Sequence, residues 1–195
     1  MQLLTRIRKS FHELNVWPSL RRFFVNTLFD STFMLLGVVI GSAFSDAPDI
    51  EVIAGTMLTT SLALGISTGV SVYEAENLER DIRIAQIEKA MIRDLNETVL
   101  TKHARKATMI IAVANFATPL VSCAVTIAPF VLTLMGLLEL RTAAWISMGL
   151  ALSILFTAGV FLGRLGKKNP WLKGLRMLGF GLLAFAIGYG IERLI

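Results

Sequence analysis

An acidic residue inside a long apolar segment is the first feature of this sequence that could do chemistry. The segment Phe23–Ser45 contains no charged residue except Asp30. An ionised group at the centre of a membrane helix costs about 2.5–3.5 kcal/mol on insertion scales, so such acids usually face a pathway or a partner. At 1.5 Å per residue, Asp30 lies about 12 Å along a helix from Arg22, short of the bilayer midplane. The cost is therefore reduced but not abolished.

The helical neighbours of Asp30 indicate metal coordination. Asn26, Asp30 and Met34 recur every four residues, which stacks an amide, a carboxylate and a thioether on one helix face. Oxygen ligands suit hard or borderline divalent ions, and a thioether adds preference for softer transition metals. We therefore expect this column to bind Fe²⁺ or Mn²⁺. The alternative is that Asp30 bonds to Thr27 or to a neighbouring helix, with Met34 as ordinary packing.

A second group of acids follows the next apolar segment. We expect Glu74, Glu76 and Glu79 to collect a metal ion at the cytoplasmic mouth of a pathway. The stretch from Glu74 to Lys106 holds seven acidic and seven basic residues. A solvated, salt-bridged helix is thus the alternative interpretation.

Polar side chains on two further apolar segments are predicted to line the pathway. Thr60, Ser67 and Ser71 recur at helical spacing, although hydroxyls that bond back to the preceding turn more often serve packing. In the next segment, Pro119 cannot donate a hydrogen bond to the carbonyl of Asn115. That oxygen must find another partner, which a helix lining a cavity would supply.

Positioning these side chains requires helices that cross a bilayer. The chain has 195 residues, 54% hydrophobic and 17% charged, with a mean hydropathy of +0.66, values that indicate an integral membrane protein. Five apolar runs are long enough to cross a hydrocarbon core of about 30 Å. They are Phe23–Ser45, Val52–Tyr73, Ala107–Leu138, Thr142–Gly163 and Gly174–Ile191. The predicted fold is an all-α membrane protein with five transmembrane helices, a single transmembrane domain over residues 1–195 without a separate soluble catalytic domain.

The distribution of Lys and Arg predicts the orientation. Five precede the first span, seven lie between the second and third, and five lie between the fourth and fifth, together 17 of 19. Because basic short loops stay in the cytoplasm, we expect a cytoplasmic N-terminus and an outside C-terminus. Residues 1–20 are expected to form an amphipathic segment on the membrane surface, and residues 74–106 a short cytoplasmic helical connection. The net charge of +5 then reflects topology and lipid contact, not nucleic acid.

Signatures of enzymatic sites are missing from the sequence. We find no nucleophile with a base, no Gly-rich phosphate loop and no His/Cys metal cage, and His12 and His103 stand alone in charged segments. Cys123 is the single cysteine, which excludes an intramolecular disulfide. We therefore predict no enzymatic activity and no tightly bound cofactor.

Four stretches resemble the vacuolar iron transporter family of divalent-metal/proton antiporters. They are FDSTFMLLGVVIGSA, GISTGVSVYEAENLERD, ANFATPLVSCAVTIAPF and LRMLGFGLLAFAIGYGIERLI. The resemblance covers most of the chain from Arg21 onward, and Asp30 matches the aspartate of the family's first helix. With Tyr73 as the anchor, the family's second-helix Met and Glu fall at Thr68 and Val72, and the cytoplasmic connection is shorter than the family's metal-binding domain.

The resemblance implies a homodimer that moves Fe²⁺ or Mn²⁺ out of the cytosol in exchange for protons. Protonation of Asp30 from the outer side would weaken coordination and release the ion. We expect the host to be a prokaryotic plasma membrane. Two alternatives stay open: a non-transporting scaffold whose cytoplasmic helices dock a partner, and a transporter of another cation or small solute.

Overall fold

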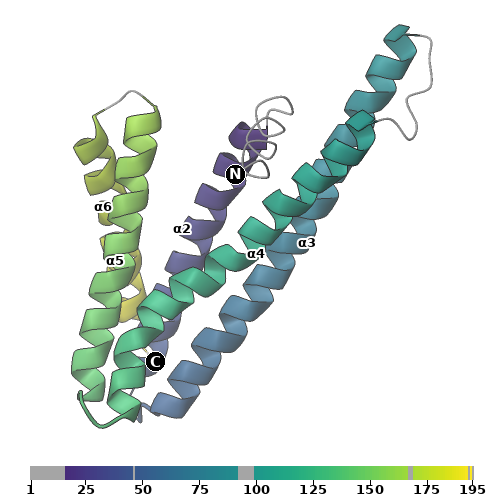
Figure 1. Cartoon of the computed structure of the whole chain (residues 1–195). Coiled ribbons are helices and arrows are strands. Elements are labelled where there is room, and N and C mark those ends of the chain that lie inside the picture. Colours follow the sequence, from purple (N-terminus) through teal and green to yellow (C-terminus); the bar gives the residue numbers. More distant parts are fainter. Residues whose placement is uncertain (1–15, 46, 92–98, 167–168, 193, 195) are drawn as a thin grey trace, which may run out of the picture. The chain divides into compact units, whose positions relative to one another are not determined.

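The described part of the chain is helical, with no strand (Figure 1). This computed structural model describes residues 16–45, 47–91, 99–166, 169–192 and 194. Within them, five helices follow one another: α2 (Val16–Ala43), α3 (Ile50–Met91), α4 (Val99–Leu134), α5 (Leu140–Leu165) and α6 (Pro170–Glu192). All five are long and apolar enough to cross a membrane. The predicted all-α fold with five transmembrane helices is confirmed, and the chain is an integral membrane protein.

Helix α3 is much longer than a bilayer crossing requires. Its 42 residues span about 63 Å at 1.5 Å per residue, roughly twice the thickness of a hydrocarbon core. Its start is capped by Asp49, whose Oδ1 accepts a hydrogen bond from the backbone N–H of Glu51 at 2.8 Å. The helical structure predicted within residues 74–106 is present up to Met91, as a direct continuation of α3, and again from Val99 in α4. Residues 92–98 of the predicted connection, and residues 1–15 of the predicted amphipathic segment, lie outside the described residues.

Helix α4 continues through two internal prolines, Pro119 and Pro129. It ends where Gly136 adopts a positive φ of 75°, a conformation that glycine takes without steric cost. The N–H of Leu137 bonds to the carbonyl of Leu132 at 3.0 Å, and the N–H of Gly136 bonds to that of Thr133 at 2.9 Å. This pair of bonds is a Schellman motif, which satisfies carbonyls that the helix end leaves open.

Two compact units make up the chain. The first contains residues 1–26 and 65–117, and the second contains residues 27–64 and 118–195. Helices α2, α3 and α4 each contribute to both. In the first unit, the small buried core of Val72, Ala107 and Ile111 is covered by Leu20 and Phe23.

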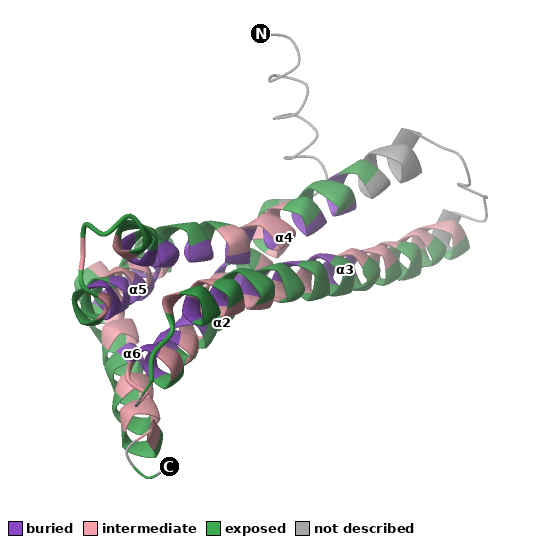
Figure 2. Cartoon of the chain, turned by 90° about the horizontal axis from the view of Figure 1, so that it is seen from below, coloured by how far each residue is buried: buried purple, intermediate pink, exposed green. Residues whose placement is uncertain are grey.

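The second unit holds the larger apolar core. Residues from α2, α3, α4 and α5 meet there, among them the fully buried Leu36, Ile53, Phe130 and Leu155. Helices α5 and α6 pack closely, because an added Cβ on Gly159 would lie 2.9 Å from the Cα of Gly174. The remaining surface of α6 is mostly exposed in Figure 2, and its large exposed side chains are apolar except for Arg176, which lies near the start of the helix.

Candidate functional site

The predicted ligands on α2 lie along an exposed face of that helix. Asn26, Asp30 and Met34 are all exposed, and 44% of the Met34 surface is accessible. Asn26 belongs to the first unit, and Asp30 and Met34 belong to the second. All three lie on the continuous helix α2. The face continues at Gly37, where no described atom lies within 4 Å of the position an added Cβ would take. A carboxylate and a thioether are therefore exposed on a membrane helix beside the open position of Gly37, and one turn further the Glu192 Oε2 lies 4.0 Å from the Cβ position of Gly41.

The three acids on α3 do not gather into one cluster. Glu74 and Glu79 are exposed, whereas Glu76 is only 4% exposed. Among the described residues, no group of three or more His, Cys, Asp or Glu side chains could hold a metal ion. The described part of a single chain thus provides isolated ligands and no complete metal cage.

Glu76 forms an ion pair inside the first unit. Its Oε2 lies 3.3 Å from Nη2 of Arg80, one helical turn further along α3. Val72, one turn before Glu76 on the same helix face, belongs to the apolar core of this unit. The sequence predicted that Glu76 collects a metal ion, with a solvated helix as the alternative, and neither interpretation included its burial, which depends on how α3 packs.

The hydroxyl residues predicted to line a pathway are spread along α3. Thr60 is half-buried in the second unit, while Ser67 and Ser71 are exposed in the first. The hydroxyl of Ser71 donates to the carbonyl of Thr68 at 3.2 Å, which is the local bonding that makes hydroxyls tolerable in a membrane helix. Their role as pathway residues stays a prediction.

Asn115 and Pro119 lie in the buried face of α4, where the structure supplies the missing hydrogen-bond donor. The hydroxyl of Thr68 on α3 lies 3.4 Å from the backbone oxygen of Asn115 and 3.3 Å from that of Gly65 on its own helix, so its single hydrogen is shared between the two acceptors. The Asn115 side chain is fully buried, and its Nδ2 donates to the carbonyl of Ile111 at 2.9 Å. The Asn115 oxygen thus has a hydroxyl from a neighbouring helix within hydrogen-bond distance, and the role of Asn115 and Pro119 as pathway residues stays a prediction.

Directly beside this contact, α3 and α4 cross closely. A Cβ added to Gly65 would lie 2.8 Å from the backbone oxygen of Phe116, and one added to Gly69 would lie 3.1 Å from the Cβ of Phe116. The four-residue spacing of these glycines is the small-residue pattern that lets membrane helices approach. This crossing fixes the depth at which Thr68 meets Asn115.

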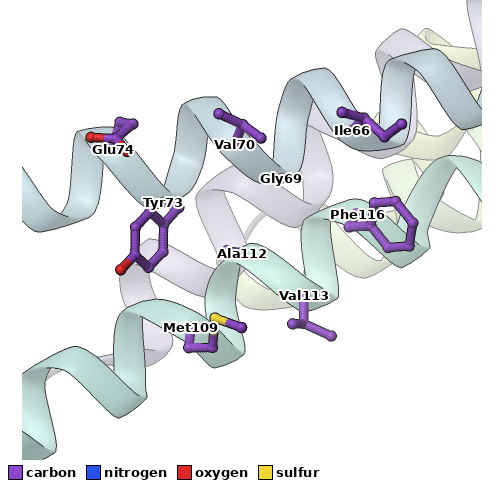
Figure 3. A pocket seen from close by; sticks show the side chains of 9 residues that line it. All are labelled: Ile66, Gly69, Val70, Tyr73, Glu74, Met109, Ala112, Val113 and Phe116. Atoms are coloured by element: carbon purple, nitrogen blue, oxygen red, sulfur yellow. The ribbon is translucent and has the colours of Figure 1, made fainter.

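An open groove lies between α3 and α4 in the first unit (Figure 3). Its volume is about 440 Å³, and its lining is almost wholly apolar. The lining residues are Ile66, Gly69, Val70, Tyr73, Glu74, Met109, Ala112, Val113 and Phe116. Figure 3 shows the Tyr73 ring directed from α3 toward α4, on which Met109 lies. Of the predicted site residues only Glu74 lines this groove, so the groove was not foreseen.

Buried hydroxyls in the second unit connect helices. The Ser31 hydroxyl lies 3.3 Å from that of Ser122, and the Ser147 hydroxyl donates to the carbonyl of Thr126 at 2.7 Å. Thr126 in turn donates to the carbonyl of Ser122 at 2.9 Å. Because carbonyls cannot pass a proton onward, this arrangement holds α2, α4 and α5 together and does not form a proton relay.

Comparisons with known proteins give two matches. The sequence profile of the VIT family matches residues 85–193, more than half of the chain. An uncharacterized protein of Methanocaldococcus jannaschii is 31% identical over 169 residues, covering 85% of this chain and 84% of the relative. The profile match begins after Glu79, so the candidate ligands on α2 and α3 lie outside it.

Proposed function

Since this chain belongs to the VIT family, we propose that it is a membrane transporter that moves a divalent transition-metal ion, Fe²⁺ or Mn²⁺, out of the cytosol. Family membership supports metal-ion transport across a membrane. The ion, its direction and its exchange for protons are our proposal. The single observation that carries it is the exposed column of amide, carboxylate and thioether on α2.

The exposed position of Asp30 supports a homodimer. An exposed carboxylate at this depth is costly against lipid, and a second polar surface on this face of α2 would reduce the cost. The surface beside it is formed by Gly37 and Gly41, whose spacing permits close approach of a second helix. A second copy would meet this face through a two-fold axis, so that each residue occurs twice.

Dimerisation would complete the metal site. Two facing columns would place two copies of Asp30 and Met34 around one path, with Asn26 one turn away. Carboxylate and thioether ligands together favour Fe²⁺ or Mn²⁺ over Ca²⁺ or Mg²⁺. The ion is cargo, so no tightly bound cofactor is part of the mechanism.

The direction of transport follows from charge and proton competition. With the N-terminus in the cytoplasm, Glu74, Glu76 and Glu79 would collect the ion at the inner mouth and Asp30 would bind it within the bilayer. Protonation of Asp30 from the outer side would remove its negative charge and release the ion, which couples export to proton entry. The proposed host is a prokaryotic plasma membrane.

Metal uptake into proteoliposomes tests this function. The purified chain should accumulate Fe²⁺ and Mn²⁺, and an opposing pH gradient should accelerate uptake. Asp30→Asn should abolish uptake while the protein remains folded. Asp81→Asn changes an exposed acid on a different helix, α3, and should leave uptake intact. Uptake that is absent in the wild type, or unchanged in Asp30→Asn, would contradict the proposal and favour a scaffold.

A further inference from the structure

The ion pair between Glu76 and Arg80 is buried and only half formed. Glu76 is 4% exposed, and the Arg80 side chain is 15% exposed. One contact joins them, from Nη2 of Arg80 to Oε2 of Glu76 at 3.3 Å. This distance is long for a charge-assisted hydrogen bond, which is usually about 2.7–2.9 Å.

The two remaining polar atoms of this pair are buried without a partner. Within the described residues, neither Oε1 of Glu76 nor Nε of Arg80 makes a hydrogen bond. Buried polar atoms in folded proteins are nearly always satisfied, and an exception calls for a specific explanation such as an absent ion or water. Within the described residues, Oε1 therefore has no protein partner, and a cation or a water molecule would supply one.

The surroundings explain why Arg80 is needed. Glu76 follows Val72 on the helix face that packs against Ala107 and Ile111 of α4. A buried carboxylate without a compensating charge is strongly unfavourable in such an apolar setting. Arg80 lies within reach of solvent through its long side chain, so it can leave the carboxylate without unfolding the helix.

We propose that Arg80 is an internal competitor of the metal ion: it neutralises Glu76 when the inner mouth is empty, and an arriving divalent cation displaces it. This inference rests on the proposed function, in which Glu76 helps to collect the ion. A divalent cation would engage both carboxylate oxygens, whereas Arg80 engages one. Arg80 thereby sets the cytosolic metal concentration at which loading begins, and it disfavours monovalent ions, which offer the carboxylate no more charge than Arg80 does.

Mn²⁺ binding to the purified protein tests the role of Arg80. Arg80→Gln should lower the dissociation constant about tenfold, a change of about 1.4 kcal/mol, because the charge that competes with the ion is removed. Arg80→Lys keeps the charge and should stay near the wild-type value. Arg83→Gln is the matched control, because it removes an exposed positive charge from the same helix.

A double-substitution cycle separates competition from a structural role. In a Glu76→Gln background, the effect of Arg80→Gln on Mn²⁺ affinity should disappear, because the contested carboxylate is gone. If Arg80→Gln alone fails to fold, Arg80→Ser in the wild-type and Glu76→Gln backgrounds provides the same comparison. An equal or weaker affinity in Arg80→Gln, or a gain that persists in the double variant, would overturn the inference alone. A wild-type protein that neither binds nor transports metal would overturn the proposed function as well.

Discussion

The hydroxyl of Thr68 lies 3.4 Å from the backbone oxygen of Asn115, the carbonyl that Pro119 leaves without its intrahelical donor. The two residues are 47 positions apart in the sequence and belong to different helices of the same unit. In a membrane helix, a carbonyl that a proline frees is satisfied by neighbouring helices, by Ser or Thr side chains, by ordered water or by local adjustment of the helix. The break in the α4 hydrogen bonds is thus repaired by α3.

Removal of the Thr68 hydroxyl should destabilise the protein. Thr68→Val keeps the shape but removes the donor to Asn115, which we expect to lower the free energy of unfolding by about 1 kcal/mol. Denaturant unfolding in detergent measures this change. Thr59→Val is the control, since the exposed Thr59 hydroxyl bonds only to carbonyls of its own helix, and it should change stability much less. Equal effects of the two substitutions would contradict this interpretation.

Replacing two glycines of α3 by alanine should change the stability of the protein in opposite directions. Gly65→Ala places a methyl group 2.8 Å from the Phe116 oxygen, so the helices must separate and we expect a loss of about 1–3 kcal/mol. Gly55→Ala enters open space and should stabilise the helix by up to about 1 kcal/mol. Thermal unfolding of both variants under one set of conditions checks the sign. A Gly65→Ala variant with unchanged stability would show that α3 and α4 are not closely packed at this point.

A bulky residue on the α2 face should prevent dimer formation. Gly37→Leu causes no clash within one chain, because no described atom lies within 4 Å of the new Cβ, but it would block close approach of a second copy. We expect the variant to elute as a monomer in detergent when its mass is measured by light scattering. Gly149→Leu is the matched control on α5, where the space around the glycine is equally open, and it should leave the dimer intact. A dimeric Gly37→Leu protein would place the interface on another surface.

Replacing the thioether on α2 should change ion preference more than fold. Met34 is 44% exposed, so Met34→Leu should cost little stability. It should reduce Fe²⁺ uptake several-fold while leaving the weaker uptake of Ca²⁺ unchanged, since only softer ions gain from sulfur. Competition assays in proteoliposomes provide the measurement. A parallel loss for both ions would assign Met34 to packing.

The sequence predicted features that depend on local spacing. Charge-poor runs of sufficient length located all five helices, and the four-residue spacing of Asn26, Asp30 and Met34 correctly placed them on one helix face. The need of the Asn115 oxygen for a partner also followed from a single local rule about proline.

Features that depend on packing between distant segments were not predictable in this way. The burial of Glu76 requires α4 and the start of α2 to cover that side of α3, and the sequence around it resembles a solvated helix. The groove between α3 and α4 likewise depends on Gly65 and Gly69, which let the two helices approach, and on the larger side chains that line it. Such contacts join residues about 45 positions apart, beyond the reach of periodicity.

The short connections between helices restrict where other proteins can act on this one. Residues 44–49 link α2 to α3 and residues 135–139 link α4 to α5, and successive crossings put both links on the same side of the membrane. Neither link is long enough to form a binding loop of its own. These two links therefore offer little surface for a soluble partner, whereas α3, with 42 residues, extends well beyond the length of one bilayer crossing and offers more.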